Sequence, residues 1–511
     1  MKPETKTAWI GTPVWVLVAM LLVASIAFSL LSAWKGYPTY RDIHLGAAIE
    51  YTKSSISLEN TRIVGFNATG TPTIQEFPLW QGLVAMVFNM IGIWSGWASL
   101  VSAILFATSL YPLYQLAKAT LDSRGGLWSL VFYLSQPLVF KYIGLGSTDG
   151  TSLSVSIWFL FFGFKLISAP TFRFLLWSGA VLAGIMAALL KLPFFMAAGI
   201  GLFCYLVVTD ARSLRNWVAL ASVGLVAATV FFAWTRYTDR LQAGAVFPFV
   251  DLRLSNPEMV WWFFGDWKSR LSLGTWLKGG WRVLNCLFGS FVLLGLGFLG
   301  GWKSRPPKLP LCLLFGGVVT TLIFSHLVLE HSHYYLMYSS AVAMLCSNAF
   351  LWLMDCFPIN QRKQWVMTGV LGILLGLSLL QGLIGMKIAA DFDPYYQRVA
   401  SIVAEHTTPQ EKILIQGGGW GGDILMRSNR RGLSIWDTGI LEDRAKLQAL
   451  KDLGYSRLVM ISESPLLTAI QKVNPGDADR KRWYYKEKRT PVVEDWPVLY
   501  QSDDIVIQEI P

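Results

Sequence analysis

The stretch WIGTPVWVLVAMLLVASIAFSLLSA runs from Trp9 to Ala33 without a charged side chain. A helix needs about 20 apolar residues to cross the hydrocarbon core of a bilayer, and this stretch is long enough. The apolar part of a cleaved signal peptide spans only about 7–15 residues, so the length favours a retained membrane anchor. The stretch therefore predicts a membrane protein.

Composition extends this prediction to the whole chain of 511 residues. Charged residues make up 15% of it and hydrophobic residues 53%, with a mean hydropathy of +0.45. A soluble globular protein carries about 25% charged residues. We expect a mainly α-helical, polytopic bundle of about eleven transmembrane helices. Besides the first stretch, the expected spans are 98–117, 127–146, 151–168, 174–190, 193–209, 216–235, 283–302, 309–329, 335–356 and 364–386.

The basic excess of the chain lies entirely within residues 1–387. Residues 388–511 hold 16 basic and 18 acidic residues, whereas the whole chain has a net charge of +11. In a membrane domain such an excess reflects the charge of short loops, so it indicates no nucleic-acid partner.

The positions of these charges predict an orientation. If the short apolar segment from Leu79 to Ile93 lies along the membrane surface, thirteen basic residues fall in short segments on one side. The positive-inside rule then places the N-terminus in the cytoplasm, and a first loop (34–97), a second large loop (236–282) and residues 388–511 outside. The expected location is a bacterial plasma membrane. The thirteen residues are Lys2, Lys6, Lys118, Arg124, Lys165, Arg173, Arg212, Arg215, Lys303, Arg305, Lys308, Arg362 and Lys363.

Residues 388–511 are predicted to form a small extracytoplasmic α/β domain beside the membrane domain of residues 1–387. Within it Gly417, Gly419 and Gly422 spell G-x-G-x-x-G, as in dinucleotide-binding loops. Dinucleotides are not supplied outside the cytoplasm, and Asp437 does not end a second strand cleanly, so no nucleotide cofactor is expected. The expected elements are a helix near 395–406, a strand at 412–416, a helix near 441–453, a strand at 457–461 and a strand near 505–509.

Three outer turns place a carboxylate at the membrane edge: Asp42 in RDIH, Glu76 in QEFP and Asp149 in STDG. Each also fits a structural role, since Asp42 and Asp149 suit helix N-caps and Glu76 precedes a helix started by a proline. Together they supply candidate general bases at a lipid–water boundary.

Cationic and aromatic side chains accompany these carboxylates. Lys191 interrupts LLKLPFF between two spans, where a lysine either snorkels to the surface or meets an anionic group. Two histidines without a third spaced ligand are a weak metal signal, so no metal and no other cofactor is predicted. The remaining candidates are Arg41 and His44, which flank Asp42, and His331, His333, Tyr334 and Tyr335 in the turn LEHSHYYLMY.

Carboxylates and cations at one membrane face suit a reaction between a lipid phosphate and a polar acceptor. A base would remove the acceptor's proton, and the cations would stabilise the charge on the leaving phosphate. A transporter or flippase of lipid-linked glycans would need ionisable residues near mid-span and gains no support from internal repeats. A non-catalytic envelope-assembly protein stays open.

At these residues the chain resembles the GT-C superfamily of integral-membrane glycosyltransferases. The resemblance is to the family-39-like group that includes protein O-mannosyltransferases and the lipid A aminoarabinose transferase. The motifs occur in that group's order: R-D-x-H…A-A-x-E-Y at Arg41–Tyr51, EFPLWQ at Glu76–Gln81, D-G at Asp149–Gly150, K-x-P at Lys191–Pro193 and H-x-H-Y-Y at His331–Tyr335.

The resemblance implies inverting transfer of a sugar from a polyprenyl-phosphate donor, on the outer face, to a glycan, lipid or protein acceptor. It assigns the catalytic base to Asp42 and two further site carboxylates to Glu76 and Asp149. Lys191 and the turn from His331 to Tyr335 would contact the lipid phosphate or the donor sugar. This chain departs from many relatives in having Ile43-His44 after Asp42 and Phe77 where a basic residue follows the equivalent of Glu76.

Overall fold

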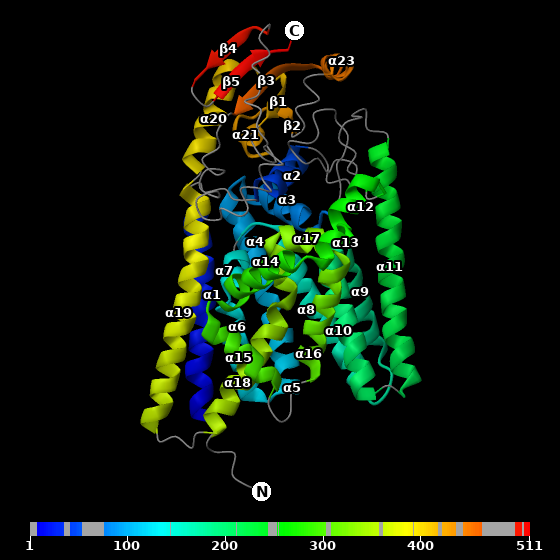
Figure 1. Cartoon of the computed structure of the whole chain (residues 1–511), viewed down its shortest axis with the longest axis vertical. Coiled ribbons are helices and arrows are strands. Elements are labelled where there is room, and N and C mark those ends of the chain that lie inside the picture. The colour runs from blue at the N-terminus through cyan, green and yellow to red at the C-terminus, as the bar shows by residue number, and fades with distance from the viewer. Residues whose placement is uncertain are drawn as a thin grey trace.

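The chain forms a helical bundle with a small β-sheet region above one end (Figure 1). The computed structural model describes residues 8–34, 41–53, 76–143, 145–210, 212–243, 253, 255–302, 308–356, 361–391, 393–416, 422–435, 443–461, 496–502 and 505–510. The expected fold class, a mainly α-helical membrane bundle with a C-terminal α/β domain, is confirmed.

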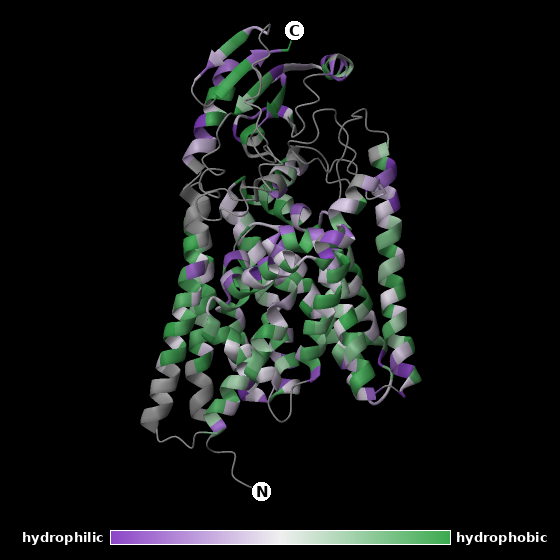
Figure 2. Cartoon of the chain, in the orientation of Figure 1, coloured by the Kyte–Doolittle hydropathy of each residue, from purple (hydrophilic) through white to green (hydrophobic). Residues whose placement is uncertain are grey.

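Apolar helices build the bundle, which is green along most of its length in Figure 2. In the described part of the chain, five helices are long and apolar enough to cross a membrane, or six if one bent pair is a single span, and five more are shorter. The count of eleven spans therefore stays a prediction. The helices of the bundle are α1 (Ala8–Trp34), α4 (Ser95–Thr108), α5 (Leu110–Thr120), α6 (Ser123–Leu134), α7 (Pro137–Ile143), α8 (Thr148–Ser168), α9 (Phe174–Leu190), α10 (Leu192–Asp210), α11 (Leu214–Ala243), α15 (Phe291–Trp302), α16 (Lys308–Ile323), α17 (Ser325–Glu330), α18 (Ser339–Cys356) and α19 (Gln361–Asp391).

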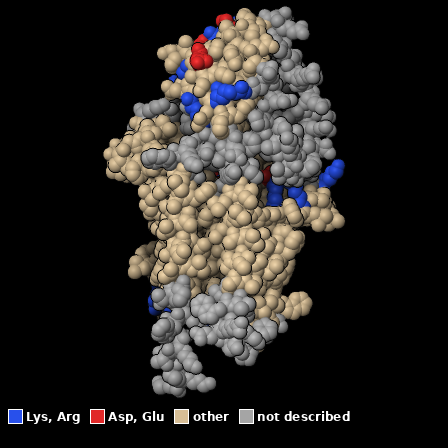
Figure 3. Space-filling model, turned by 90° about the vertical axis from the view of Figure 1, so that its left-hand side faces the viewer, with Lys and Arg blue, Asp and Glu red and all other residues tan. Residues whose placement is uncertain are grey.

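The helices of the bundle differ in how much of their surface is buried. The apolar window that includes α18 is 83% buried, whereas that of α11 is only 28% buried, so α18 lies in the centre and α11 at the edge. Large apolar side chains such as Leu175 and Trp302 point outward. Figure 3 shows a broad band of the surface without visible Lys, Arg, Asp or Glu among the described residues. Such a surface suits lipid, and the protein is an integral membrane protein.

The span expected at 283–302 begins later than predicted. Residues Leu273–Phe288, comprising helix α14 (Leu273–Val283) and a π-helical turn η3 (Leu284–Phe288), meet α15 at an angle of 93°. The bend is possible because Gly289 adopts a φ of +70°. Residues with a side chain rarely reach this left-handed region. Of the two helices, only α15 therefore runs in the direction expected of a membrane span, and α14 is nearly perpendicular to α15.

Two short helices of the first loop cover one end of the bundle. Helix α2 (Arg41–Lys53) packs Leu45 and Ala48 against Trp80 and Val84 of α3 (Leu79–Ile91). At a rise of about 1.5 Å per residue, α3 measures about 20 Å, which is shorter than the hydrocarbon core of about 30 Å. Its length agrees with the prediction that this segment lies along the membrane surface.

The second loop also folds into short helices rather than extended chain. Helix α11 continues to Ala243, past the predicted span end at residue 235. Two further helices, α12 (Pro257–Phe264) and α13 (Trp267–Leu271), then lead to α14.

The C-terminal region contains a five-stranded sheet in the order β2-β1-β3-β5-β4. Successive side chains of a strand point to opposite faces. Ile413 and Ile415 of β1 therefore pack towards Val399 and Val403 of α20, whereas Leu414 packs towards Leu450 of α23. The strands are β1 (Lys412–Gln416), β2 (Arg431–Ile435), β3 (Tyr455–Ile461), β4 (Val498–Gln501) and β5 (Ile505–Glu509), and the helices are α20 (Asp393–His406), α21 (Gly422–Arg427) and α23 (Arg444–Asp452).

All five elements expected in this region are present, but β2, β4 and α21 were not predicted. Strand β2 ends at Ile435, whereas Asp437 lies outside the described residues, so the expectation that Asp437 does not end a strand cleanly stays a prediction. Gly417 and Gly419 lie outside the described residues, and the prediction that they bind no nucleotide stays a prediction. Helix α21 contacts α2 of the first loop, which joins the two parts of the molecule.

Candidate active site

The site is built around Lys191, at the junction of two helices. Lys191 is the C-cap of α9, and Pro193 lies in the first turn of α10. Its ammonium nitrogen lies 2.9 Å from Glu76 Oε1 and 2.9 Å from Asp149 Oδ1, and its side chain is only 8% exposed. One buried cation therefore joins carboxylates from two other segments of the chain.

Local contacts hold both carboxylates in place. Thr148 Oγ1 donates to Glu76 Oε2 over 2.8 Å, and the amide of Phe77 donates to the carbonyl of Leu189 at the end of α9. Asp149 lies in the first turn of α8, where the helix dipole favours a negative charge. The N-cap of α8 is Ser147, so the N-cap role considered for Asp149 was wrong.

The glycine after Asp149 allows two helices to approach closely. A Cβ atom at Gly150 would lie 2.7 Å from the carbonyl oxygen of Tyr142 in α7. No real Cβ contact is that short, so a larger residue would push α8 away from α7 and shift Asp149. The D-G pair is therefore explained by packing.

The turn before α18 brings two more predicted residues to the carboxylates. His333 and Tyr334 belong to a 3₁₀ helix, η4 (Ser332–Tyr338), and His333 Nε2 lies 3.9 Å from Asp149 Oδ1. The Lys191 ammonium lies 5.1 Å from the centre of the Tyr334 ring, within the range of a cation–π contact. We call Glu76, Asp149, Lys191, His333 and Tyr334 the carboxylate cluster.

His331 adjoins this cluster, and Tyr335 does not. The His331 ring lies 5.4 Å from that of His333, its Nδ1 is 3.2 Å from the carbonyl oxygen of Leu327, and burial lowers its pKa. Tyr335 stacks on Tyr338 and its hydroxyl lies towards Gly279 of α14.

The first loop reaches the cluster through His44. Its Nδ1 lies 3.1 Å from Gln81 Nε2, and the ring interacts electrostatically with Glu76, Asp149 and Lys191. Burial lowers the pKa of His44, so the imidazole is neutral near pH 7. Asp42 and Arg41 belong to the first turn of the same helix, but their side chains lie outside the described part of the structure.

The charges of the cluster do not balance. Burial alone would lower the pKa of Lys191, but the carboxylates of Asp149 and Glu76 outweigh it and raise that pKa well above its ordinary value. One lysine charge faces two carboxylates, which leaves a net negative charge. Such a site attracts hydroxyl or ammonium groups of an acceptor or sugar.

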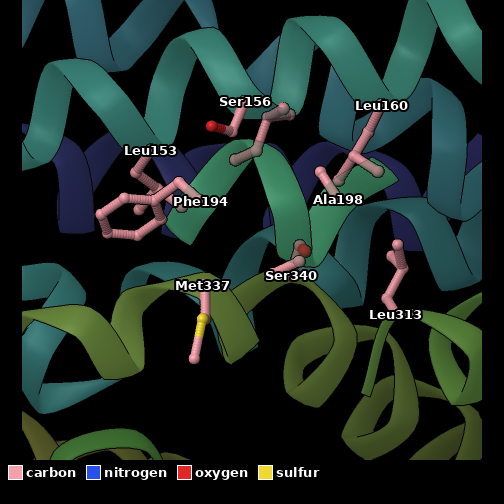
Figure 4. Close-up of a pocket in the computed structure, with 10 residues that line it drawn as sticks. Leu153, Ser156, Leu160, Phe194, Ala198, Leu313, Met337 and Ser340 are labelled. Atoms are coloured by element: carbon pink, nitrogen blue, oxygen red, sulfur yellow. The ribbon is translucent and has the colours of Figure 1, made fainter. Parts of the chain in front are cut away.

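The pocket next to the cluster is small. A pocket of about 10 Å³ lies between α8, α10 and α18, lined by residues that include Leu153, Phe194, Met337 and Ser340 (Figure 4). This volume holds about one water molecule and is too small for a sugar. Within the described residues, no group of three or more His, Cys, Asp or Glu side chains could hold a metal ion.

Thr148 and Gln81 were not predicted as site residues. Thr148 immediately precedes Asp149, and Gln81 is the polar residue in the apolar run after Pro78. Each lies next to or near a predicted residue, and this was the only signal in the sequence. The hydrogen bond from Thr148 to Glu76, 72 residues away, is visible only in the fold.

Comparison with known proteins agrees with this architecture. Residues 77–237 match the family model described as dolichyl-phosphate-mannose-protein mannosyltransferase. The structure is similar to ArnT from Cupriavidus metallidurans bound to undecaprenyl phosphate, with a TM-score of 0.59, 13% identity and 98% of both chains covered. The chain has the GT-C fold. The expected resemblance to that superfamily is thereby confirmed.

Two other proteins share the GT-C fold. The oligosaccharyltransferase AglB from Archaeoglobus fulgidus, solved with an inhibitory peptide and a dolichol-phosphate, matches with a TM-score of 0.55 and 10% identity over 97% of this chain and 73% of its own. The arabinofuranosyltransferase AftD from Mycobacteria matches with a TM-score of 0.52 and 14% identity, over 87% of this chain and 35% of its own. No curated protein sequence matches the chain.

Proposed function

We propose that this protein transfers a sugar from a polyprenyl-phosphate donor to a polar acceptor, with inversion at the anomeric carbon. The observation that carries the proposal is the buried carboxylate cluster, in which Lys191 holds Glu76 and Asp149 at one end of a GT-C fold. Solved proteins with this fold bind undecaprenyl phosphate or dolichol-phosphate. The experiment below compares hexose and pentose donors. It uses envelope extract, which contains glycans, lipids and proteins, as the source of acceptor.

Asp42 is the proposed catalytic base. Helix α2 carries His44 into electrostatic contact with the cluster, Asp42 belongs to the first turn of that helix, and the resemblance to the superfamily assigns the base to Asp42. In the reaction, a lone pair of the acceptor oxygen or nitrogen attacks the anomeric carbon. The bond from that carbon to the phosphate oxygen breaks, and its electron pair stays on the leaving polyprenyl phosphate. The acceptor proton passes to the carboxylate of Asp42 and from there to solvent.

Glu76 and Asp149 take a supporting role in this scheme. Lys191 fixes their positions, and their free lone pairs accept hydrogen bonds from sugar or acceptor hydroxyls. The Tyr334 ring packs beside Lys191 and gives an apolar face to the site. No cofactor enters these steps.

The reaction is proposed to occur on the outer face of the membrane. Helices α2 and α3 and the sheet lie at the same end of the bundle (Figure 1). The basic residues predicted to be cytoplasmic, such as Lys118, Arg124 and Lys165, lie at helix ends. The N-terminus is then cytoplasmic, and the C-terminal domain lies outside.

Release of polyprenyl phosphate tests the function. The purified full-length protein is incubated in lipid nanodiscs with radiolabelled polyprenyl-phosphate hexoses and pentoses and with envelope extract as acceptor. We expect one donor to be consumed, and Asp42→Asn to lower the rate at least 1,000-fold, about 4 kcal/mol of transition-state stabilisation.

Asp122→Asn is the matched control. Asp122 is half-exposed, N-caps α6 and lies away from the cluster, and asparagine preserves the cap. Wild-type release by Asp42→Asn would overturn the assignment of the base. If the wild-type protein consumes none of the donors with any extract, the proposed function is wrong.

A further inference from the structure

An open groove lies on the exposed side of α11, which stands at the edge of the bundle (Figure 1). Its volume of about 620 Å³ falls within the range of about 300–1,000 Å³ that small-molecule sites occupy. The reaction proposed above uses none of the side chains that line it. All of the lining residues belong to α11: Thr229, Phe232, Ala233, Arg236, Tyr237 and Arg240.

The length of α11 places this groove at a boundary of the membrane. About 20 residues of an α-helix, each rising about 1.5 Å, cross a hydrocarbon core of about 30 Å. Counted from Leu214, where α11 begins, that distance ends near Ala233. Arg236 and Arg240 then lie just beyond the core, at the depth of the lipid phosphates.

The two arginines are at the level of the carboxylate cluster. Trp234 packs against Leu189, two residues before Lys191. In the orientation predicted from loop charge, this end of the bundle faces away from the cytoplasm. The positive-inside rule explains basic residues on the cytoplasmic side only, so Arg236 and Arg240 need another explanation.

One face of α11 carries exposed apolar side chains that lead to the two arginines. Val218, Leu225 and Phe232 recur at every seventh position and are 59%, 69% and 64% exposed. With about 3.6 residues per turn, Arg236 and Arg240 fall on the same face. An apolar strip followed by two cations matches the order of acyl chain and headgroup in a lipid leaflet.

Within the described residues, neither arginine has a partner. Both side chains are exposed, no carboxylate lies within ion-pair distance of Arg236 or Arg240, and neither guanidinium makes a hydrogen bond. Asp239 belongs to the same turn but does not line the groove. Two guanidiniums one turn apart can hold one phosphate group through bidentate hydrogen bonds.

The opposite side of α11 packs behind the carboxylate cluster. Trp234 is 8% exposed, and its ring centre lies 5.1 Å from that of Phe77. Phe77 directly follows Glu76, and its amide donates to the carbonyl of Leu189 over 3.0 Å. A ligand that holds this end of α11 would therefore also support the backbone beside Glu76.

We propose that Arg236 and Arg240 bind the phosphate of an anionic phospholipid from the outer leaflet, with its acyl chains beside Phe232 and Leu225. A phosphate without an accompanying ammonium group fits best, because two arginines would repel the cation of a zwitterionic headgroup. A soluble phosphate would leave the apolar strip uncovered. This inference does not depend on the proposed function, since it requires no sugar transfer.

Native mass spectrometry of the full-length protein in detergent counts its bound lipids. The protein is titrated with phosphatidylglycerol and with phosphatidylcholine, which has the same phosphate but also carries a cation. We expect the wild-type protein to bind phosphatidylglycerol about 10-fold more tightly, and Arg236→Gln with Arg240→Gln to reduce that ratio below about 2-fold. Arg431→Gln with Lys451→Gln removes two exposed charges from the C-terminal domain and should keep the wild-type ratio.

Ala233 allows a test that keeps both arginines. Ala233→Glu places a carboxylate one turn before Arg236 and should remove the preference for phosphatidylglycerol, whereas the uncharged Ala233→Gln should retain it. Because these positions are exposed, all variants should unfold at the wild-type temperature without added lipid. Phosphatidylglycerol should raise the unfolding temperature of the wild-type protein but not that of the double glutamine variant, since a bound ligand stabilises the folded state.

Three outcomes would overturn the proposal. The first is an unchanged lipid preference in both the double glutamine variant and Ala233→Glu. The second is displacement of phosphatidylglycerol by inorganic phosphate at similar concentration, which would assign the arginines to a soluble anion. The third is tighter binding of undecaprenyl phosphate than of phosphatidylglycerol at these arginines, which would make the occupant a polyprenyl lipid instead of a bilayer phospholipid.

Discussion

The ammonium of Lys191 lies 2.9 Å from Asp149 Oδ1, although the two residues lie at the ends of different helices. Asp149 lies in the first turn of α8, and Lys191 is the C-cap of α9. The contact joins one end of each helix and holds one carboxylate of the site in place. Because the Asp149 side chain is only 11% exposed, solvent screens this ion pair much less than a pair on the surface.

Removal of the lysine charge should be severe. Lys191→Met leaves the buried Asp149 and the partly exposed Glu76 without a counter-charge, which costs about 3–5 kcal/mol of stability. We expect a lower unfolding temperature and no transfer activity. Lys191→Arg keeps the charge and should recover most of the stability, and the double variant Lys191→Met with Asp149→Asn should be more stable than Lys191→Met alone. Equal stability of Lys191→Met and the wild-type protein would contradict the ion-pair assignment.

Thr148 should contribute through its hydrogen bond alone. Thr148→Val keeps the shape of the side chain but leaves Glu76 Oε2 without its donor. The lost hydrogen bond costs about 1–2 kcal/mol. We predict that Thr148→Val lowers kcat, but less than Asp42→Asn does, because Glu76 still contacts Lys191. Thr148→Ser, which retains the hydroxyl, is the control. A larger loss from serine than from valine would show that the methyl group matters and the hydrogen bond does not.

Stability should fall as the pH drops below about 6.5, the ordinary pKa of histidine. Burial lowers the pKa of His44, so the folded protein keeps this imidazole neutral where the unfolded chain already binds a proton. The unfolded state then holds more protons, and folding loses free energy as pH falls from the unfolded value towards the lower folded value.

His44→Gln removes this proton uptake. We expect unfolding temperatures of the variant, measured between pH 7.5 and pH 5.5, to vary less than those of the wild-type protein. His406→Gln in the C-terminal domain is the control. An identical pH dependence of His44→Gln and the wild-type protein would contradict this prediction.

The bend before α15 should depend on one glycine. Gly289→Ala places a Cβ atom 2.9 Å from that of Ser378, at a φ of +70°. The strained backbone and the close contact should cost about 1–3 kcal/mol. Gly280→Ala on α14, where a Cβ atom meets nothing within 4 Å, should be neutral or slightly stabilising. Thermal unfolding of both variants checks this. Equal stability of the two would mean that the bend does not need the left-handed residue.

The helical class and much of the carboxylate cluster could be predicted from sequence because both depend on local patterns. Long apolar runs indicated the helices, and polar residues at their ends indicated one shared face. The contacts between these side chains were not predictable. Nothing in the sequence shows that Lys191 contacts Glu76 and Asp149, since that depends on how α3, α8 and α9 pack.

The residues that lie around α14 escaped prediction for a different reason. Lys141 lies inside a run interpreted as a span, and Arg282 was interpreted as the end of a polar loop. The bend at Gly289 brings α14 across the bundle towards Tyr335. The direction of α14 thus depends in part on one positive φ, and sequence patterns carry little information on it.

In the proposed reaction, the contact between α21 and α2 would couple the C-terminal domain to the helix that carries the base. Helix α2 has the C-terminal domain on one side and α3 on the other, and it carries both His44 and Asp42. A rotation of the domain when it meets an acceptor would move α2 directly, because no described element lies between them. The timing of proton removal would then depend on a domain that supplies none of the reacting groups.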